Sequence, residues 1–166
     1  MAAAYSAGAS GFPFGVVRGY EGTDLAARTR VDWITCPFTG EQVAAVPAIR
    51  PDVGIVHAQQ ADEDGNVQLW GISGVQKEVI LASSRSIVTV EEIVPRLDSR
   101  PNTVFLPAWT ITAVSVAPGG AHPSYAHGYY DRDNEFYVRW DDVSRDRETF
   151  REWMRLHVLE PETATV

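Results

Sequence analysis

Cysteine and lysine are nearly absent from this 166-residue chain, whose only examples are Cys36 and Lys77. A single cysteine excludes an internal disulfide and is typical of a reducing compartment. Positive charge is also scarce, with 14 Lys and Arg against 22 Asp and Glu and a formal net charge of −8. This balance disfavours non-specific nucleic-acid binding, which depends on clustered basic residues.

Long hydrophobic runs are missing as well. No apolar run approaches the roughly 20 residues that a membrane-spanning helix needs, and no cationic flank of a signal peptide precedes the small residues at the start. We therefore expect a cytoplasmic protein with no membrane and no nucleic-acid partner. The length and the 45% hydrophobic content predict a single domain over residues 1–166, with a flexible tail at 160–166.

The segment Asp52 to Val94 carries most of the structural information. Its β-branched runs predict buried strands, its Asp-Gly-Asn turn suits a hairpin, and Ser73 with Gln76 three residues later predicts a capped helix. Strands that alternate with a helix indicate an α/β fold with a central sheet. The predicted order is a strand at Val53–Val56, a turn at Asp62–Asn66, a strand at Val67–Trp70, the helix, and a strand at Ser86–Val90.

Weaker signals extend this pattern on both sides. Residues 2–9 resemble the end of a small-residue helix, and Arg18–Thr29 has the composition of a polar loop. Further strands are expected at Pro13–Val17, Arg30–Thr35, Gln42–Val46, Thr103–Leu106 and Ile111–Val116.

A C-terminal helix is predicted between an N-cap at Asp146 and Pro161. Its apolar side chains are spaced as one helix face, and this aromatic face must pack on the sheet of the chain or on a partner subunit, of which the sheet is favoured. The face consists of Phe150, Trp153, Met154, His157 and Val158.

Three ordered motifs resemble the α subunit of family I CoA-transferases, in particular the α subunits of the glutaconate CoA-transferase group. The first is AGASGFPFGVVRGYEGTDL at residues 7–25, the second is the Asp52–Val94 segment, and the third is APGGAHPS at Ala117–Ser124. The resemblance implies a three-layer CoA-transferase-type sheet with flanking helices. Family α subunits are much longer and carry opening strands before the first motif, so the resemblance implies a chain without the N-terminal part of the family fold. A fragment, a misplaced start codon and a natural half-subunit all fit.

The resemblance also implies a mechanism. Family I enzymes transfer CoA through a glutamate thioester, and in two-subunit members this glutamate belongs to the β subunit. We therefore expect no catalytic nucleophile in this chain, no metal and no tightly bound cofactor, with a CoA thioester as substrate. The implied partner is a CoA-transferase β subunit, in a heterodimer or heterotetramer.

Four consecutive residues after the last predicted strand, Gly119, Gly120, Ala121 and His122, are the first candidates for substrate or CoA binding. Two glycines let a backbone approach a ligand closely and present N–H groups to it. His122 is able to donate a hydrogen bond to a carboxylate or thioester. The competing interpretation is a tight turn whose histidine bonds a backbone carbonyl.

Four further candidates are scattered along the chain. His57 and Gln59 follow the Val53–Val56 strand, Arg18 follows the Pro-Phe strand, and Glu91 lies beside Glu92 at the end of a strand. Arg18 is suited to an acidic substrate or a CoA phosphate, and only one of two adjacent strand carboxylates faces a given site. The more common explanation of the same residues is structural: a satisfied histidine at the sheet edge for His57, and ion pairs or contacts with a partner subunit for Glu91 and Arg18.

Two other functions stay open. Relatives of this fold hydrolyse a carbon–carbon bond in cyclic CoA thioesters, and a non-catalytic subunit remnant would keep the same motifs. A requirement for a free-acid acceptor separates the transferase from the hydrolase. An exposed sheet edge and apolar face would favour the remnant or a missing half.

Overall fold

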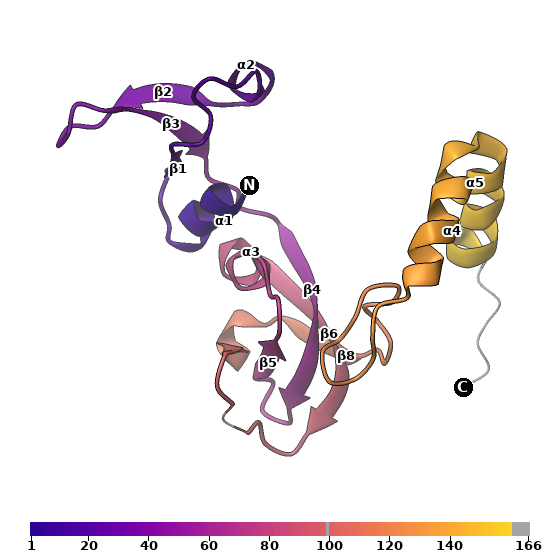
Figure 1. The fold of residues 1–166 in the computed structure, drawn as a ribbon. Coiled ribbons are helices and arrows are strands. Elements are labelled where there is room, and N and C mark those ends of the chain that lie inside the picture. Colours follow the sequence, from indigo (N-terminus) through magenta and orange to yellow (C-terminus); the bar gives the residue numbers. More distant parts are fainter. Residues whose placement is uncertain (99, 161–166) are drawn as a thin grey trace. The chain divides into compact units, whose positions relative to one another are not determined.

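The computed structural model describes residues 1–98 and 100–160, and the chain divides into two compact units, Met1–Gly120 and a second that begins at Ala121. Figure 1 shows the elements of both units. The prediction of a single domain over 1–166 stays a prediction. The predicted tail at 160–166 and the helix end at Pro161 lie, apart from Glu160, outside the described residues.

A five-stranded mixed sheet forms the centre of the first unit, with the order β7-β5-β4-β6-β8. Strands β4, β6 and β8 are parallel neighbours, and β5 runs antiparallel between β4 and β7. The predicted α/β class is thus confirmed. The strands span Val53–Asp62 (β4), Val67–Trp70 (β5), Arg85–Val94 (β6), Thr103–Leu106 (β7) and Ala113–Val116 (β8).

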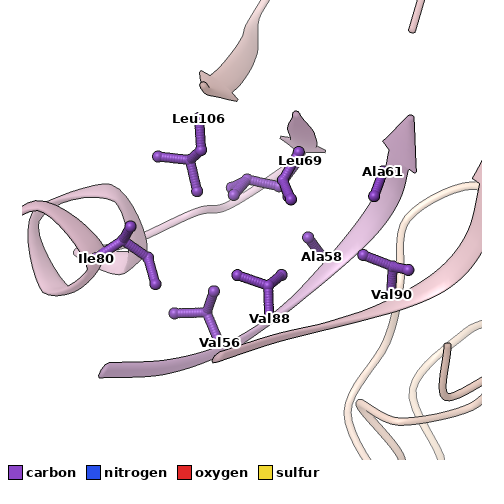
Figure 2. Packing of buried hydrophobic residues seen from close by; sticks show 9 residues of the cluster. Val56, Ala58, Ala61, Leu69, Ile80, Val88, Val90 and Leu106 are labelled. Carbon is purple, nitrogen blue, oxygen red and sulfur yellow. The ribbon is translucent and has the colours of Figure 1, made fainter. Parts of the chain in front are cut away.

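Only one face of β4 and β6 enters the hydrophobic core. Figure 2 shows Val56 and Val88 on this face beneath Ile80 of helix α3 (Gln76–Ala82), and all three are buried. Alternate residues point to the opposite face, where Val53 is 44% and Ile55 67% exposed. The prediction of a strand buried throughout was therefore wrong, because alternation in the first half of β4 exposes Val53 and Ile55.

Helix α3 begins later than predicted and without the predicted capping box. Val75 is its N-cap residue, and no side chain caps the helix. The Gln76 side chain instead donates a hydrogen bond from Nε2 to the carbonyl oxygen of His57 at 3.4 Å. The backbone at Ser73 accepts a turn hydrogen bond from Gln76 N–H, so the sequence places a turn just before the helix.

The predicted hairpin between β4 and β5 is confirmed. Gly65 has φ of +86°, a conformation that glycine adopts at little cost. Asn66 uses its side chain instead, donating from Nδ2 to both carboxylate oxygens of Asp62. The turn is thereby fixed by side-chain hydrogen bonds as well as by glycine.

A smaller antiparallel sheet of order β1-β3-β2 precedes β4. Helix α1 (Ala2–Ala9) is present as predicted. It packs closely on this part of the chain: a Cβ on Gly8 would collide with the backbone of Ile49, and a Cβ on Gly15 with the backbone of Ala3. A short helix, α2 (Leu25–Arg28), lies within the predicted polar loop. The strands are β1 (Phe14–Val17), β2 (Asp32–Thr35) and β3 (Gln42–Pro47).

The second unit contains a pair of helices, α4 (Asn134–Arg145) and α5 (Arg147–Met154), followed by a π-helical turn, η2 (Arg155–Leu159). Asp146 caps α5 by accepting from Thr149 N–H, as predicted. The sequence patterns did not reveal α4, which begins at a similar cap, Asp133. The aromatic face of α5 contacts α4, where the ring centroids of Trp140 and Trp153 lie 4.7 Å apart. Packing of this face on the sheet or on a partner subunit stays a prediction.

A 3₁₀ turn, η1 (Ala108–Thr110), leads into β8. Over the described ranges, none of the helices combines the length and the apolar character needed to span a membrane.

Candidate functional site

A chain of hydrogen bonds joins the central strands β4 and β6 on the face opposite the core. His57 and Thr89 are direct partners in the parallel register, and Nδ1 of His57 lies 2.9 Å from the Thr89 hydroxyl. The other ring nitrogen, Nε2, lies 2.6 Å from Oε1 of Glu91. An ionised carboxylate only accepts, so Nε2 is the donor in the contact with Glu91, and Nδ1 is paired with the Thr89 hydroxyl.

This cluster is shielded from water. The side chain of Glu91 is 4% exposed and that of His57 14%. A carboxylate that is this buried requires donors in place of water. His57 supplies one, and the backbone N–H of Gly119 supplies another to Oε2 at 2.8 Å.

The structure therefore brings together four of the predicted site residues: His57, Glu91, Gly119 and Gly120. A Cβ on Gly120 would lie 2.8 Å from Cε1 and Nδ1 of the His57 ring, so the turn backbone passes directly over the imidazole. Gly119 has φ of +75°, which glycine alone adopts readily. Gly120 thus permits the close approach of the turn to the sheet, and Gly119 permits its left-handed backbone conformation.

The N–H groups of this turn are already engaged. Gly119 donates to Glu91, Gly120 donates to the carbonyl oxygen of Ala117, and Ala121 donates to the hydroxyl of Tyr130. In this conformation these three N–H groups are therefore not available to bind a phosphate or carbonyl, the role expected for them from the sequence. A role of the turn in substrate binding stays a prediction, through its exposed surface.

Glu91 and its neighbour Glu92 have different partners, as expected of adjacent strand residues. Glu92 accepts from Nε2 of Gln60 at 2.8 Å. Gln59, another candidate, is buried and holds β4 to β5: its Nε2 donates to the carbonyl oxygen of Trp70, and its Oε1 accepts from Trp70 N–H. The amide of Gln59 is therefore structural in this conformation.

His122 belongs to the second unit. Its Nε2 lies 3.3 Å from Oδ2 of Asp133, and its ring packs edge-on against Phe136. The side chain is 53% exposed, which leaves it accessible. The hydrogen bond of Phe136 N–H, followed by the weaker bond of His122, lowers the pKa of Asp133 below its ordinary value.

Arg18 lies next to the end of β1 and forms an exposed ion pair with Glu41 at 2.8 Å. Both side chains line a cavity of about 550 Å³ on the small sheet, together with Phe14, Val16 and Cys36. The Thr39 hydroxyl, and then the N–H groups of Phe38 and Thr39, lower the pKa of Cys36. Cys36 is partly exposed, and these hydrogen bonds favour its thiolate form.

Thr89 is the one member of the cluster that the sequence patterns did not reveal. Its β-branched shape marks it as a strand residue, and nothing in its local sequence indicates a polar partner. The signal lies in the register: paired residues of β4 and β6 are 32 positions apart in the sequence, which places Thr89 beside His57. Such a register is a tertiary property.

The mixed sheet, the flanking helices and a polar cluster joined to the turn after β8 define an α/β protein of the open-sheet class. The family model for Coenzyme A transferase matches residues 1–117. The chain belongs to this family, which confirms the resemblance of its sequence motifs.

Individual relatives agree with this assignment. The chain is 59% identical to the A subunit of 3-oxoadipate CoA-transferase from Pseudomonas knackmussii, over 93% of its own length and 55% of that protein. It is 40% identical to the A subunit of glutaconate CoA-transferase from Acidaminococcus fermentans, over 79% of its length and 43% of the relative. The crystal structure of glutaconate coenzyme A-transferase from A. fermentans superposes with a TM-score of 0.79 and 33% identity, covering 93% of this chain and 55% of that one.

The similarity extends over only part of each relative. The chain spans about half the length of the curated relatives that it matches. The fold prediction of a CoA-transferase-type sheet is confirmed over this half.

Proposed function

We propose that this chain is part of the α subunit of a CoA-transferase, which moves CoA between an acyl-CoA thioester and a free carboxylic acid. The observation that carries the proposal is the 59% identity, over 93% of the chain, to a protein named as the A subunit of a CoA-transferase. The nucleophilic glutamate resides on a partner β subunit. This chain completes the acyl-CoA site and the surface on which the β subunit docks.

The substrate class follows from the relatives. Two of them are named for 3-oxoadipate and glutaconate, which are both dicarboxylic acids. We therefore assign this chain to an enzyme for a small dicarboxylic acid, with 3-oxoadipate as the first acceptor to test. The CoA thioester is a substrate, the enzyme uses no tightly bound cofactor, and the scarcity of cysteine suits the cytoplasm.

The binding residues proposed for this chain are those of the sequence analysis, with roles limited by the geometry. His122 and the exposed surface of the Gly119–Ala121 turn contact the substrate or CoA. Arg18 contributes after exchange of its ion pair with Glu41 for an anionic ligand, which is feasible because that pair is exposed and weak. His57, Gln59 and Glu91 are held within the sheet by hydrogen bonds and contribute to the site by stabilising its structure.

The test is an exchange assay on the complex purified from its native source through this chain. Succinyl-CoA is incubated with 3-oxoadipate, and the acyl-CoA products are measured by liquid chromatography and mass spectrometry. The proposal predicts 3-oxoadipyl-CoA only when the free acid is present. A second assay supplies a cyclic acyl-CoA without any acid acceptor. Addition of water that opens the ring and leaves CoA attached would assign the hydrolase alternative, and no reaction in either assay would leave the subunit remnant.

A further inference from the structure

The hydrogen-bonded cluster on β4 and β6 ends at an exposed turn. Thr89, His57 and Glu91 form a continuous series of polar contacts of 2.9 Å and 2.6 Å, and Glu91 then accepts from Gly119 N–H at 2.8 Å. The series therefore connects two strands inside the sheet to the first residues after β8. Gly119 and Glu91 are 28 positions apart in the sequence.

The two ends of this series differ in their exposure. Glu91 is buried and His57 mostly buried, whereas Pro118, Gly119 and Gly120 are exposed. The side chains of His57 and Glu91, which fix the position of the turn, are thus shielded from water, while the turn itself is accessible to a ligand. Loops at the carboxyl ends of parallel strands are where open α/β sheets bind ligands.

Steric contact between Gly120 and the His57 ring limits how closely the turn approaches the sheet. The backbone at Gly120 lies so close to the His57 ring that a Cβ at this position would come within 2.8 Å of two ring atoms. The hydrogen bond from Gly119 holds the turn down, and the imidazole limits its approach. Both oxygens of Glu91 are engaged here, Oε1 with His57 and Oε2 with Gly119 N–H.

We propose that His57 and Glu91 are positioning residues for CoA transfer, which act by holding the Pro118–Gly120 turn in place and do not touch substrate. This inference rests on the proposed function, since it concerns the same reaction. Thr89 orients the imidazole through Nδ1. The negative charge of Glu91 is not required, because the role is to accept hydrogen bonds.

Because the role of Glu91 does not require its negative charge, a neutral residue that forms the same hydrogen bonds tests the proposal. In Glu91→Gln, the amide oxygen accepts from Gly119 N–H, and the amide NH₂ donates to Nε2 of the other His57 tautomer. The turn then keeps its place. In Glu91→Ala both bonds are lost, and a displacement of about 1 Å in a site costs on the order of 10²-fold in rate.

The experiment measures kcat and KM of the native complex that carries each variant, with pH–rate profiles and melting temperatures. We expect Glu91→Gln to keep kcat/KM within about 5-fold of the unmodified complex, with a profile of unchanged shape, and Glu91→Ala to lose about 10- to 100-fold. Thr89→Val, which keeps the side-chain shape, loses an intermediate amount. Glu63→Gln, in the exposed β4–β5 turn, is the matched control and stays unchanged.

Two results would overturn the proposal. One is a Glu91→Gln complex that melts normally but is as inactive as Glu91→Ala or lacks one limb of the pH profile, since the carboxylate would then perform chemistry. The other is full activity of both Glu91→Ala and Thr89→Val. If Glu91→Ala does not assemble, Glu91→Gln and Thr89→Val still decide the question. Failure of the unmodified complex to transfer CoA would refute the proposed function instead.

Discussion

His57 and Glu91 lie 34 positions apart in the sequence, and their side chains meet at 2.6 Å between Nε2 and Oε1 on two parallel strands. Glu91 is buried and His57 mostly buried, so each replaces water for the other. This contact, with the Gly119 hydrogen bond, ties the strands to the turn that carries the predicted binding residues. Its energetic consequences are directly measurable.

Replacement of His57 by Leu should destabilise the protein. Glu91 would keep the Gly119 donor but lose the imidazole, and a buried charged acceptor that loses a donor costs about 2–3 kcal/mol. The measurement is the free energy of unfolding of the native complex by urea. A double variant, His57→Leu with Glu91→Leu, should recover part of the loss, and equal stability of the single variant and the parent protein would contradict the account.

Replacement of Gly120 by Ala should also destabilise the protein, by about 1–3 kcal/mol. The added methyl group would lie 2.8 Å from the His57 ring and equally close to the carbonyl oxygen of Ala117. Gly19→Ala is the matched control, since a Cβ there meets nothing within 4 Å. Melting temperatures that fall equally for both variants would show that the turn does not lie against the imidazole.

Cys36 should react faster with iodoacetamide than an ordinary thiol at neutral pH. Hydrogen bonding, chiefly from the Thr39 hydroxyl, lowers the pKa of Cys36 and so raises its thiolate fraction. Thr39→Val should slow the alkylation, whereas Thr23→Val, whose hydroxyl bonds Tyr20, should not. Because the chain has one cysteine, intact-mass measurement of the adduct gives the rate, and equal rates for all three proteins would refute the role of Thr39.

The helical pair of the second unit should lose helix content in acid. Backbone N–H donation from Phe136 and Thr149 lowers the pKa of Asp133 and Asp146 respectively. A lowered folded-state pKa means that the stabilisation is complete above the ordinary value of about 3.9 and is lost as the pH falls through the lowered value. Circular dichroism should therefore show a decline below about pH 4.

The control for this acid transition is the Asp133→Asn, Asp146→Asn double variant. Asparagine caps helices as well as aspartate does, but it does not titrate. The variant should keep its helix content at low pH where the parent chain loses it. An identical acid transition in both proteins would place its origin outside the two caps.

The exposed face of the five-stranded sheet should make the isolated chain self-associate. Ile55 and Ile87 are direct neighbours on this face and are both exposed, and contiguous apolar patches promote association. Ile55→Lys should raise the monomeric fraction measured by light scattering. Ile72→Lys, at an isolated and 89% exposed position, should change it little, and an equal effect of both would show that the patch is not responsible.

Local sequence patterns predicted the strands and most helices of the first unit. The predicted strand Thr103–Leu106 has the same bounds as β7, and Asp146 caps α5 as predicted. Local signals were insufficient at Ser73, where the capping motif competes with a turn, and at Asn134–Arg145, whose charged residues obscured an aromatic face. Burial of Ile55 was misjudged because a β-branched run does not state how many faces of a sheet are covered.

In the candidate site, too, local sequence predicted individual residues but not their contacts. Motifs drew attention to His57, Glu91, Gly119 and Gly120 individually, and the structure joins them. Their contacts depend on the register between β4 and β6 and on the return of the chain through β8. No local pattern encodes that register, so Thr89 and the engagement of the turn N–H groups became visible only in the fold.

The most direct test of the central claim locates the covalent intermediate. The native complex is incubated with an acyl-CoA without acceptor acid, and the intact mass of every subunit is measured. The account predicts that CoA is attached to a companion subunit, while this chain, or the longer subunit that contains it, stays unmodified. Covalent CoA on a residue of this chain would contradict the assignment of the nucleophile to the partner.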